Sequence, residues 1–203
     1  MIEQFPIIIT VRDRLTALLQ LVRWLESVGQ REIWFCDNAS TYPPLLAFLK
    51  ATKYRVHYNN FNLGHRAPWL SGLVPELGHD QYFIVTDPDV VPTAECPDDA
   101  LPIFKRALEQ HPDIDKVGFS LKIDDLPDHY QHKKNVILWE SQFWKDKVTS
   151  ELYRAPIDTT FAMYRPGLGH KNGKSLRTAP PYEARHLPWY QDSQNSTEEE
   201  QYY

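Results

Sequence analysis

Two carboxylates one residue apart, Asp87 and Asp89, are the sharpest chemical feature of this sequence. They directly follow the apolar run 82–86, which has the composition of a buried strand. Carboxylate oxygens in this arrangement can share a hard divalent cation, Mg²⁺ or Mn²⁺, which keeps some waters and takes phosphate oxygens from a substrate. A D-x-D triplet can equally be a solvated acidic turn, so its interpretation depends on the surrounding elements.

Polar side chains also follow three other predicted strands, at 6–11, 32–36 and 54–58. In an open α/β sheet, ligands bind outside the carboxyl ends of the strands, so these side chains should converge on one crevice. The candidate binding residues beside Asp87 are Thr10, Arg12, Asp37, Asn38, Asn62, Gly64, His65 and Arg66.

Two of these groups have a functional and a structural interpretation. Asp37 could accept a hydrogen bond from a base or ribose, although Asp-Asn after a strand commonly forms an Asx turn. Gly64 would allow close backbone approach while Arg66 pairs with a diphosphate. The alternative for this second group is a glycine turn followed by a surface arginine.

The elements that must position these residues alternate along the first half of the chain. Apolar residues recur at helical spacing over 15–28, with Gly29 at a C-cap position, and Pro43 can open a second helix. A third helix is expected over 67–77. Strands alternating with helices predict an α/β fold with a mostly parallel central sheet flanked by helices.

The second half of the sequence is less regular. Helices are expected over 98–110 and 135–144, and strands over 116–123 and 157–164. From Arg165 onward, Gly, Pro and polar residues predict loop or an ordered arm, and the acidic stretch 191–203 predicts a solvated polar segment. We expect a single domain over 1–203.

Composition excludes several classes of protein. The 203 residues are 42% hydrophobic and 13% aromatic, which is typical of a globular protein rather than a disordered one. A net charge of −5 without a basic block argues against nucleic acid as a partner. No apolar run approaches the ~20 residues of a membrane span, and the first residues lack the pattern of a secretion signal. With two cysteines, Cys36 and Cys96, we expect a reducing, cytoplasmic compartment.

The stretch 6–92 resembles the GT-A glycosyltransferases, especially the large family-2-like group that uses nucleotide sugars to build bacterial polysaccharides. The matching elements, in the family's order, are an apolar strand ending in a Thr/Arg cluster, then D-N-x-S at 37–40, N-x-G at 62–64 and D-x-D at 87–89. The resemblance implies a nucleotide-sugar donor with its base near Thr10, Arg12 and Asp37. It also implies a divalent metal, Mn²⁺ or Mg²⁺, bridging the diphosphate to Asp87 and Asp89. The GT-A-like domain would then have a nucleotide-sugar-binding half at about 1–95 and an acceptor-facing half at about 96–190.

The remaining site residues are candidates from the second half. Many GT-A enzymes add a distant histidine to the metal site, and His186 is the candidate here, the alternative being a surface histidine on an extended arm. The Glu-Asp pair that usually supplies the catalytic base is absent. Asp158, a charge inside an apolar run, is the first candidate base, or else it caps a turn or pairs with Arg154. Glu140 is the second.

The expected function is therefore metal-dependent transfer of a hexosyl or deoxyhexosyl group from a nucleotide diphosphate donor to a hydroxyl of a glycan or other acceptor. The missing Glu-Asp pair favours one alternative, a catalytically inactive nucleotide-binding or scaffold protein. A sugar-phosphate nucleotidyltransferase is a weaker alternative, because its glycine-rich loop after the first strand is replaced by the glycine-free 12–15.

Overall fold

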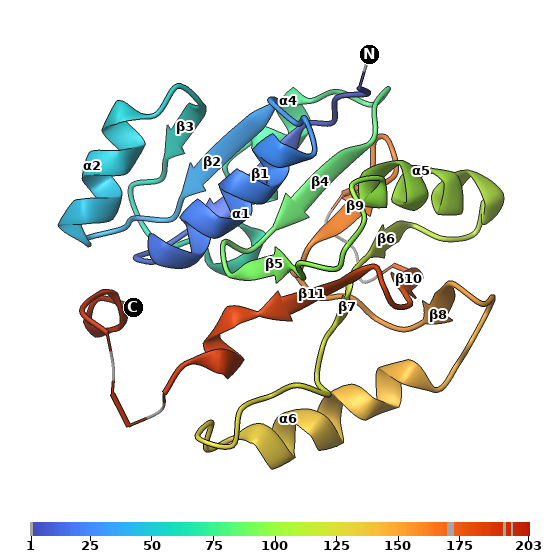
Figure 1. Ribbon diagram of the computed structural model, residues 1–203. Coiled ribbons are helices and arrows are strands. Elements are labelled where there is room, and N and C mark those ends of the chain that lie inside the picture. Colours follow the sequence, from blue (N-terminus) through green and yellow to red (C-terminus); the bar gives the residue numbers. More distant parts are fainter. Residues whose placement is uncertain (1, 170–172, 193, 196) are drawn as a thin grey trace.

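The computed structural model describes residues 2–169, 173–192, 194–195 and 197–203. A central eight-stranded sheet has the strand order β3-β2-β1-β4-β9-β6-β10-β8, and a three-stranded sheet has the order β5-β11-β7 (Figure 1). The first four strands are β1 (Ile7–Val11), β2 (Ile33–Asp37), β3 (Arg55–Tyr58) and β4 (Phe83–Thr86). Their pairings are all parallel. The predicted α/β class, with a mostly parallel sheet flanked by helices, is confirmed.

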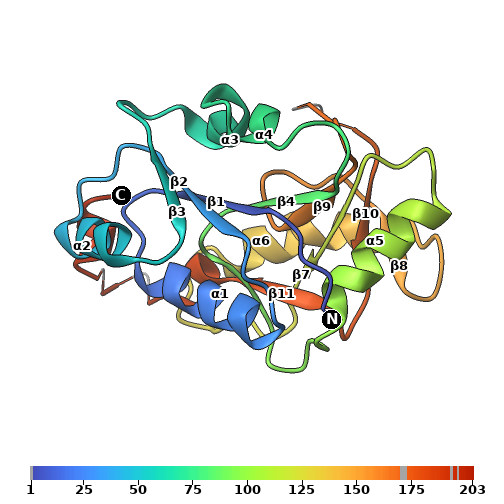
Figure 2. The ribbon, with the colours of Figure 1, turned by 90° about the horizontal axis from the view of Figure 1, so that it is seen from above.

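Alternating residues of β1 separate the two faces of the sheet. Ile7 and Ile9 pack in the cluster that includes α1 (Thr16–Ser27), α2 (Pro43–Ala51) and α5 (Ala100–Gln110). Ile8 packs on the other face, in the cluster that includes α3 (Ala67–Leu70) and α4 (Leu73–Glu76). Figure 2 shows α1 and α5 on one side of the strands and α3 and α4 on the other. This double cover explains why all five residues of β1 are buried.

The predicted elements of the first half are confirmed, with one correction. Helix α1 buries the stripe Leu18, Leu21, Val22 and Leu25 and ends before Gly29, whose φ of +82° suits a left-handed C-terminal turn. The helix expected over 67–77 is instead divided into α3 and α4. Gly72, with φ +87°, lies between them and interrupts the helical backbone.

The second half differs more from the expectation. The strand expected over 116–123 is divided into β6 (Lys116–Gly118) and β7 (Ser120–Leu121), which belong to different sheets. Only Ala162–Tyr164 of the range 157–164 forms a strand, β9. The helix expected over 135–144 is α6 (Lys133–Glu140) followed by the 3₁₀ turn η2 (Ser141–Trp144). The short strands β5 (Val90–Pro92) and β8 (Leu152–Arg154) complete this part.

The loop or arm expected from Arg165 onward is wrong, because this region contains two strands, β10 (Ser175–Thr178) and β11 (Glu183–His186). Strand β10 joins the central sheet between β6 and β8, and β11 lies between β5 and β7. Both are short and polar, so their strand structure depends on partners that are distant in sequence. The 3₁₀ turns η3 (Leu187–Tyr190) and η4 (Glu199–Gln201) follow. No helix in the described ranges is long and apolar enough to cross a bilayer.

Candidate functional site

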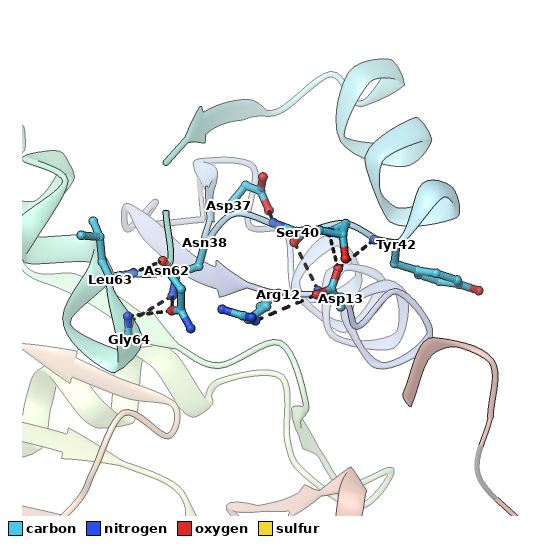
Figure 3. Close-up of polar contacts among 10 residues, drawn as sticks. Arg12, Asp13, Asp37, Asn38, Ser40, Tyr42, Asn62, Leu63 and Gly64 are labelled. Carbon is cyan, nitrogen blue, oxygen red and sulfur yellow. Dashed lines mark hydrogen bonds and ion pairs between the residues drawn. The ribbon is translucent and has the colours of Figure 1, made fainter. Parts of the chain in front are cut away.

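The loops after β1 and β2 are fixed to each other by a buried carboxylate. Asp13, which is 1% exposed, accepts hydrogen bonds at Oδ1 from the backbone N–H groups of Thr41 (2.6 Å) and Tyr42 (2.8 Å). Its own N–H donates to Ser40 Oγ at 3.2 Å. Figure 3 shows these contacts beside Arg12. The carboxyl ends of β1 and β2 are thereby held in a fixed relative position.

Asn38 fixes the third strand end in the same way (Figure 3). Its Nδ2 donates to Asn62 Oδ1 at 2.6 Å, and its Oδ1 accepts from the N–H of Leu63 at 2.7 Å. Gly64, with φ +67°, donates its N–H to Asn62 Oδ1 at 2.8 Å. Asp37 is turned toward its own loop, where it accepts a 3.3 Å bond from the N–H of Ser40, and burial raises its pKa.

The end of β4 carries the two carboxylates of the D-x-D triplet. Asp87 accepts a 2.8 Å hydrogen bond from Thr159 Oγ1, and burial, followed by the nearby charge of Asp89, raises the pKa of Asp87 to about 7. Asp89 Oδ2 lies 3.4 Å from Arg14 NH1, and Asp89 Oδ1 lies 3.7 Å from His186 Nε2. Burial lowers the pKa of His186, which favours its neutral form.

The β5–β11 ladder explains why His186 reaches Asp89. His186 pairs in register with Val90, the residue after Asp89, and the N–H of Leu187 donates to the Asp89 carbonyl at 2.8 Å. This antiparallel pairing brings together residues nearly a hundred positions apart. His186 is therefore at the end of a paired strand, and not on the extended arm that was the alternative interpretation.

These strand ends enclose a cavity of about 290 Å³, called here the strand-end cavity. Of the predicted residues, Thr10, Arg12, Asn38, Asn62, Gly64, His65, Asp87, Asp89 and His186 line it. Asp37 and Arg66 do not line the cavity. The Asp37 carboxylate bonds to Ser40 in its own loop, and Arg66 is exposed on η1 (Gly64–Arg66). Sequence reasoning missed Arg14, Thr159 and Tyr203. Of these three, only Arg14 could have been found from the sequence, because it lies just after the first strand, where binding residues are expected.

The strand-end cavity has the donor types that suit a divalent cation. Asp89 Oδ1 and His186 Nδ1 are both buried, and neither has a hydrogen-bond partner among the described residues. Carboxylate oxygen and imidazole nitrogen are ordinary ligands for Mn²⁺. In the described part of the chain, however, no three His, Cys, Asp or Glu side chains are already grouped to hold a metal ion. The residues fit a site in which the protein supplies a few ligands and water and phosphate supply the others.

A second cavity, of about 520 Å³, adjoins the first through Asp87, Thr159 and His186. We call it the α6 cavity because Trp139 and Glu140 of that helix line it. Its other lining residues include Leu121, Phe143, Pro156, Ile157, Asp158, Thr160, Arg177 and Trp189. Both candidate bases, Asp158 and Glu140, are therefore in this cavity.

The two candidate bases have different environments. Asp158 is exposed and precedes β9, so the premise that its charge is buried within a strand is wrong. Arg154, its suggested partner, instead pairs with Asp146. Glu140 is buried and accepts a 2.7 Å hydrogen bond from Arg177, and burial raises the pKa of Glu140 despite that partner. Asp158 is thus the freer of the two carboxylates.

Comparison with known proteins supports the fold. No protein-family model and no curated protein matches the sequence. Among solved structures, the mannosyltransferase PcManGT from Pyrobaculum calidifontis, in complex with GDP-Man and Mn²⁺, has a TM-score of 0.50 at 14% identity. The match covers 78% of this chain and 43% of that one. TarS (residues 1–349) from S. aureus has a TM-score of 0.46 at 13% identity, covering 80% and 47%.

The fold and the crevice at the β1–β4 strand ends place the chain among GT-A-like, Rossmann-type architectures. The chain spans less than half the length of either of these two proteins.

Proposed function

We propose that this chain is a metal-dependent glycosyltransferase that moves a hexosyl or deoxyhexosyl group from a nucleotide diphosphate donor to an acceptor hydroxyl, in polysaccharide or glycoconjugate synthesis. The observation that carries the proposal is the convergence of the β1–β4 strand ends on one cavity containing Asp87, Asp89 and His186. The mannosyltransferase with a similar fold was solved with a nucleotide sugar and Mn²⁺, which supports this choice of ligands.

In this proposal the strand-end cavity holds the donor. Thr10, Arg12, Asn38 and Asn62 surround the nucleotide, with the base on the side toward Asp37, while Arg66 would need to move to reach the diphosphate. Asp87, Asp89 and His186 would hold a divalent metal, whose Lewis-acid chemistry stabilises the charge of the leaving diphosphate.

The α6 cavity holds the acceptor in this proposal. Asp158 takes the proton of the acceptor hydroxyl while that oxygen bonds to the sugar's anomeric carbon and the bond to the diphosphate oxygen breaks. Trp139 and Trp189 offer flat apolar surface to a sugar face. Because Asp87 and His186 line both cavities, the transferred sugar would cross a short distance between them.

A thermal-shift experiment tests the donor site. The protein would be heated with GDP, UDP, dTDP and their sugar conjugates, each with Mn²⁺, Mg²⁺ or EDTA. A ligand that binds the folded state at 100 times its Kd should stabilise it by about 2.7 kcal/mol. A metal-dependent rise in Tm with one nucleotide supports the proposal and identifies the base. No change in Tm with any nucleotide or metal, for protein that is folded before heating, would refute it.

A nucleotide-binding protein without transferase activity is the second candidate. It is favoured by the pairing of Glu140 with Arg177 and by the exposure of Asp158, since neither carboxylate is a buried, free base. Release of nucleoside diphosphate over many turnovers separates the two candidates. An enzyme releases nucleotide in excess of protein, whereas a binding protein saturates at one equivalent.

A further inference from the structure

Most residues of the segment 198–203 are exposed, as expected for a solvated segment, but buried Glu199 docks the segment on the start of α1. Glu199 is only 7% exposed. Its Oε2 accepts hydrogen bonds from the backbone N–H groups of Leu15 and Thr16, at 3.0 Å each, and from Thr16 Oγ1 at 3.2 Å. Helix α1 has no side-chain cap at Leu15, so Glu199 supplies the missing acceptor from 183 residues away. Figure 1 shows the last turn beside this end of α1.

The docked segment packs one aromatic ring on the loop before α2 and brings another to the strand-end cavity. The ring centroids of Tyr202 and Tyr42 are 5.1 Å apart. The Tyr203 ring centroid lies 4.1 Å from Cζ of Arg14, and Tyr203 itself lines the cavity. The anchor at Glu199 therefore fixes the position of a ring that covers Arg14.

Arg14 lines the strand-end cavity and has a hydrogen-bond donor without a partner in the described part of the chain. Its side chain is 14% exposed and its NH1 lies 3.4 Å from Asp89 Oδ2. Its buried Nε has no hydrogen-bond partner among the described residues, and the same holds for NH1 of Arg12. Buried donors without a partner carry a desolvation cost that a charged acceptor would relieve. The guanidinium geometry suits a phosphate, and the neighbouring Asp89 places Arg14 at the candidate diphosphate end of the cavity.

We propose that Arg14 contacts the phosphates of the bound nucleotide, and that segment 198–203, anchored by Glu199, is a positioning element that holds Arg14 in place through Tyr203. This inference rests on the proposed donor site and adds Arg14 together with Glu199 and Tyr203, two residues that the sequence patterns did not indicate. The ring of Tyr203 shields one face of the guanidinium from water, which strengthens its attraction for an anion.

The phosphate contact is tested by titrating wild type and Arg14→Gln with GDP, UDP, inorganic pyrophosphate, and the free nucleosides guanosine and uridine. We expect Arg14→Gln to weaken nucleoside diphosphate and pyrophosphate binding by at least about tenfold, the range for hydrogen bonds to charged groups. Nucleoside affinity should stay within about twofold. Arg23→Gln, an exposed arginine on α1, makes the same charge change away from the cavity and should have no effect.

The anchor is tested separately with Glu199→Ala and its exposed neighbour Glu198→Ala as control. We expect Glu199→Ala to lower diphosphate affinity severalfold and to speed hydrogen exchange at the Leu15 and Thr16 amides, which lose their acceptor. Glu198→Ala should change neither. If the Leu15 and Thr16 amides still exchange slowly in Glu199→Ala, the anchoring role is overturned, whatever the nucleotide affinity of the variant.

The outcomes distinguish this inference from the proposed function. Nucleotide binding that is unchanged in a folded Arg14→Gln overturns the phosphate contact and leaves the glycosyltransferase proposal standing. A second outcome is that wild type binds pyrophosphate but shows no nucleotide-specific binding, and that Arg14→Gln loses the pyrophosphate. This outcome supports an anion site at Arg14 and refutes the nucleotide donor. If wild type binds neither pyrophosphate nor a nucleoside diphosphate, both the phosphate contact and the proposed donor site are overturned.

Discussion

The strand-end cavity and the α6 cavity meet at three residues but are built differently. The strand-end cavity is fixed by backbone amides and short side chains at the ends of neighbouring parallel strands, as the contacts of Asp13 and Asn38 illustrate. The α6 cavity is built by aromatic side chains and by one buried ion pair, Glu140–Arg177, which joins α6 to β10. The parallel ladder itself shapes the first cavity, whereas the second depends on a few long-range side-chain contacts.

In the proposed function, the strand-end cavity binds the donor and the α6 cavity carries out the transfer. The first is held by many backbone contacts, whereas the second depends on a few side-chain contacts. Changes in the strand-end cavity should affect nucleotide affinity with modest effects on stability. Changes in the α6 cavity should affect turnover, acceptor use or folding while donor binding persists.

The largest effect is expected from Asp158→Asn. Removing a general base typically costs about 10²–10⁴-fold in rate, so turnover should fall by that factor while nucleotide-sugar affinity stays within about twofold. Initial transfer rates and equilibrium titration measure the two quantities. Asp146→Asn, an exposed carboxylate paired with Arg154, is the control and should retain wild-type turnover. A rate for Asp158→Asn within threefold of wild type would assign the base elsewhere.

Breaking the Glu140–Arg177 pair should destabilise the fold. Glu140→Ala or Arg177→Ala leaves an uncompensated buried charge, so each should lower the free energy of unfolding by about 3–5 kcal/mol. The double variant Glu140→Leu/Arg177→Met should lose less than the two single variants together, since it leaves neither charge behind. Denaturant unfolding measures all three. Single losses below about 1 kcal/mol would mean that the pair does not hold α6 in place.

Asp89→Ala should act in the opposite way, on nucleotide binding rather than on folding. We expect affinity for nucleoside diphosphate with Mn²⁺ to fall on the order of 100-fold, with a smaller loss in EDTA, because the variant removes a carboxylate of the proposed metal site. Calorimetric titration measures both conditions. Asp113→Ala removes an equal charge at an exposed site paired with Lys174 and should leave both affinities unchanged. Equal losses with and without metal would argue against metal binding by Asp89.

The smallest effect is expected from Trp139→Ala. Trp139 is 64% exposed and lines the α6 cavity, so its loss should raise the acceptor KM by up to about tenfold, consistent with about 0.5–1.5 kcal/mol for a ring contact. Nucleotide affinity and Tm should not change. Leu138→Ala, its more exposed neighbour outside the cavity lining, is the matched control. If both variants raise the KM equally, the effect belongs to the surface of α6 and not to the cavity.

The strand-end cavity was largely predictable because its information is local. Strands β1, β2 and β4 are compact, mainly apolar runs, whereas β3 (Arg55–Tyr58) is more polar and partly exposed; polar residues follow each of the four strands immediately. Parallel strands place their carboxyl ends at one edge, so sequence order alone brings Thr10, Asn38 and Asp87 together. Asp37 and Arg66 are the exceptions: the Asp37 carboxylate bonds to Ser40 in its own loop, and Arg66 is exposed on η1.

The second half lacked such local signals. Strands β10 and β11 are polar and four residues long, and their burial comes from pairing with β6, β8, β5 and β7. Their composition therefore resembles that of a loop until those partners are known. The exposure of Asp158 and the pairing of Glu140 with Arg177 also depend on the packing of α6 and β10.

The sequence by itself determined the α/β class, the four parallel strands and the polar residues at their ends, because hydrophobic periodicity and strand-end chemistry are properties of neighbouring residues. Only the tertiary structure placed His186 beside Asp89, Glu199 on the start of α1, and Tyr203 on Arg14. These contacts join residues roughly a hundred or more positions apart, and no local pattern encodes which distant side chain supplies the missing partner.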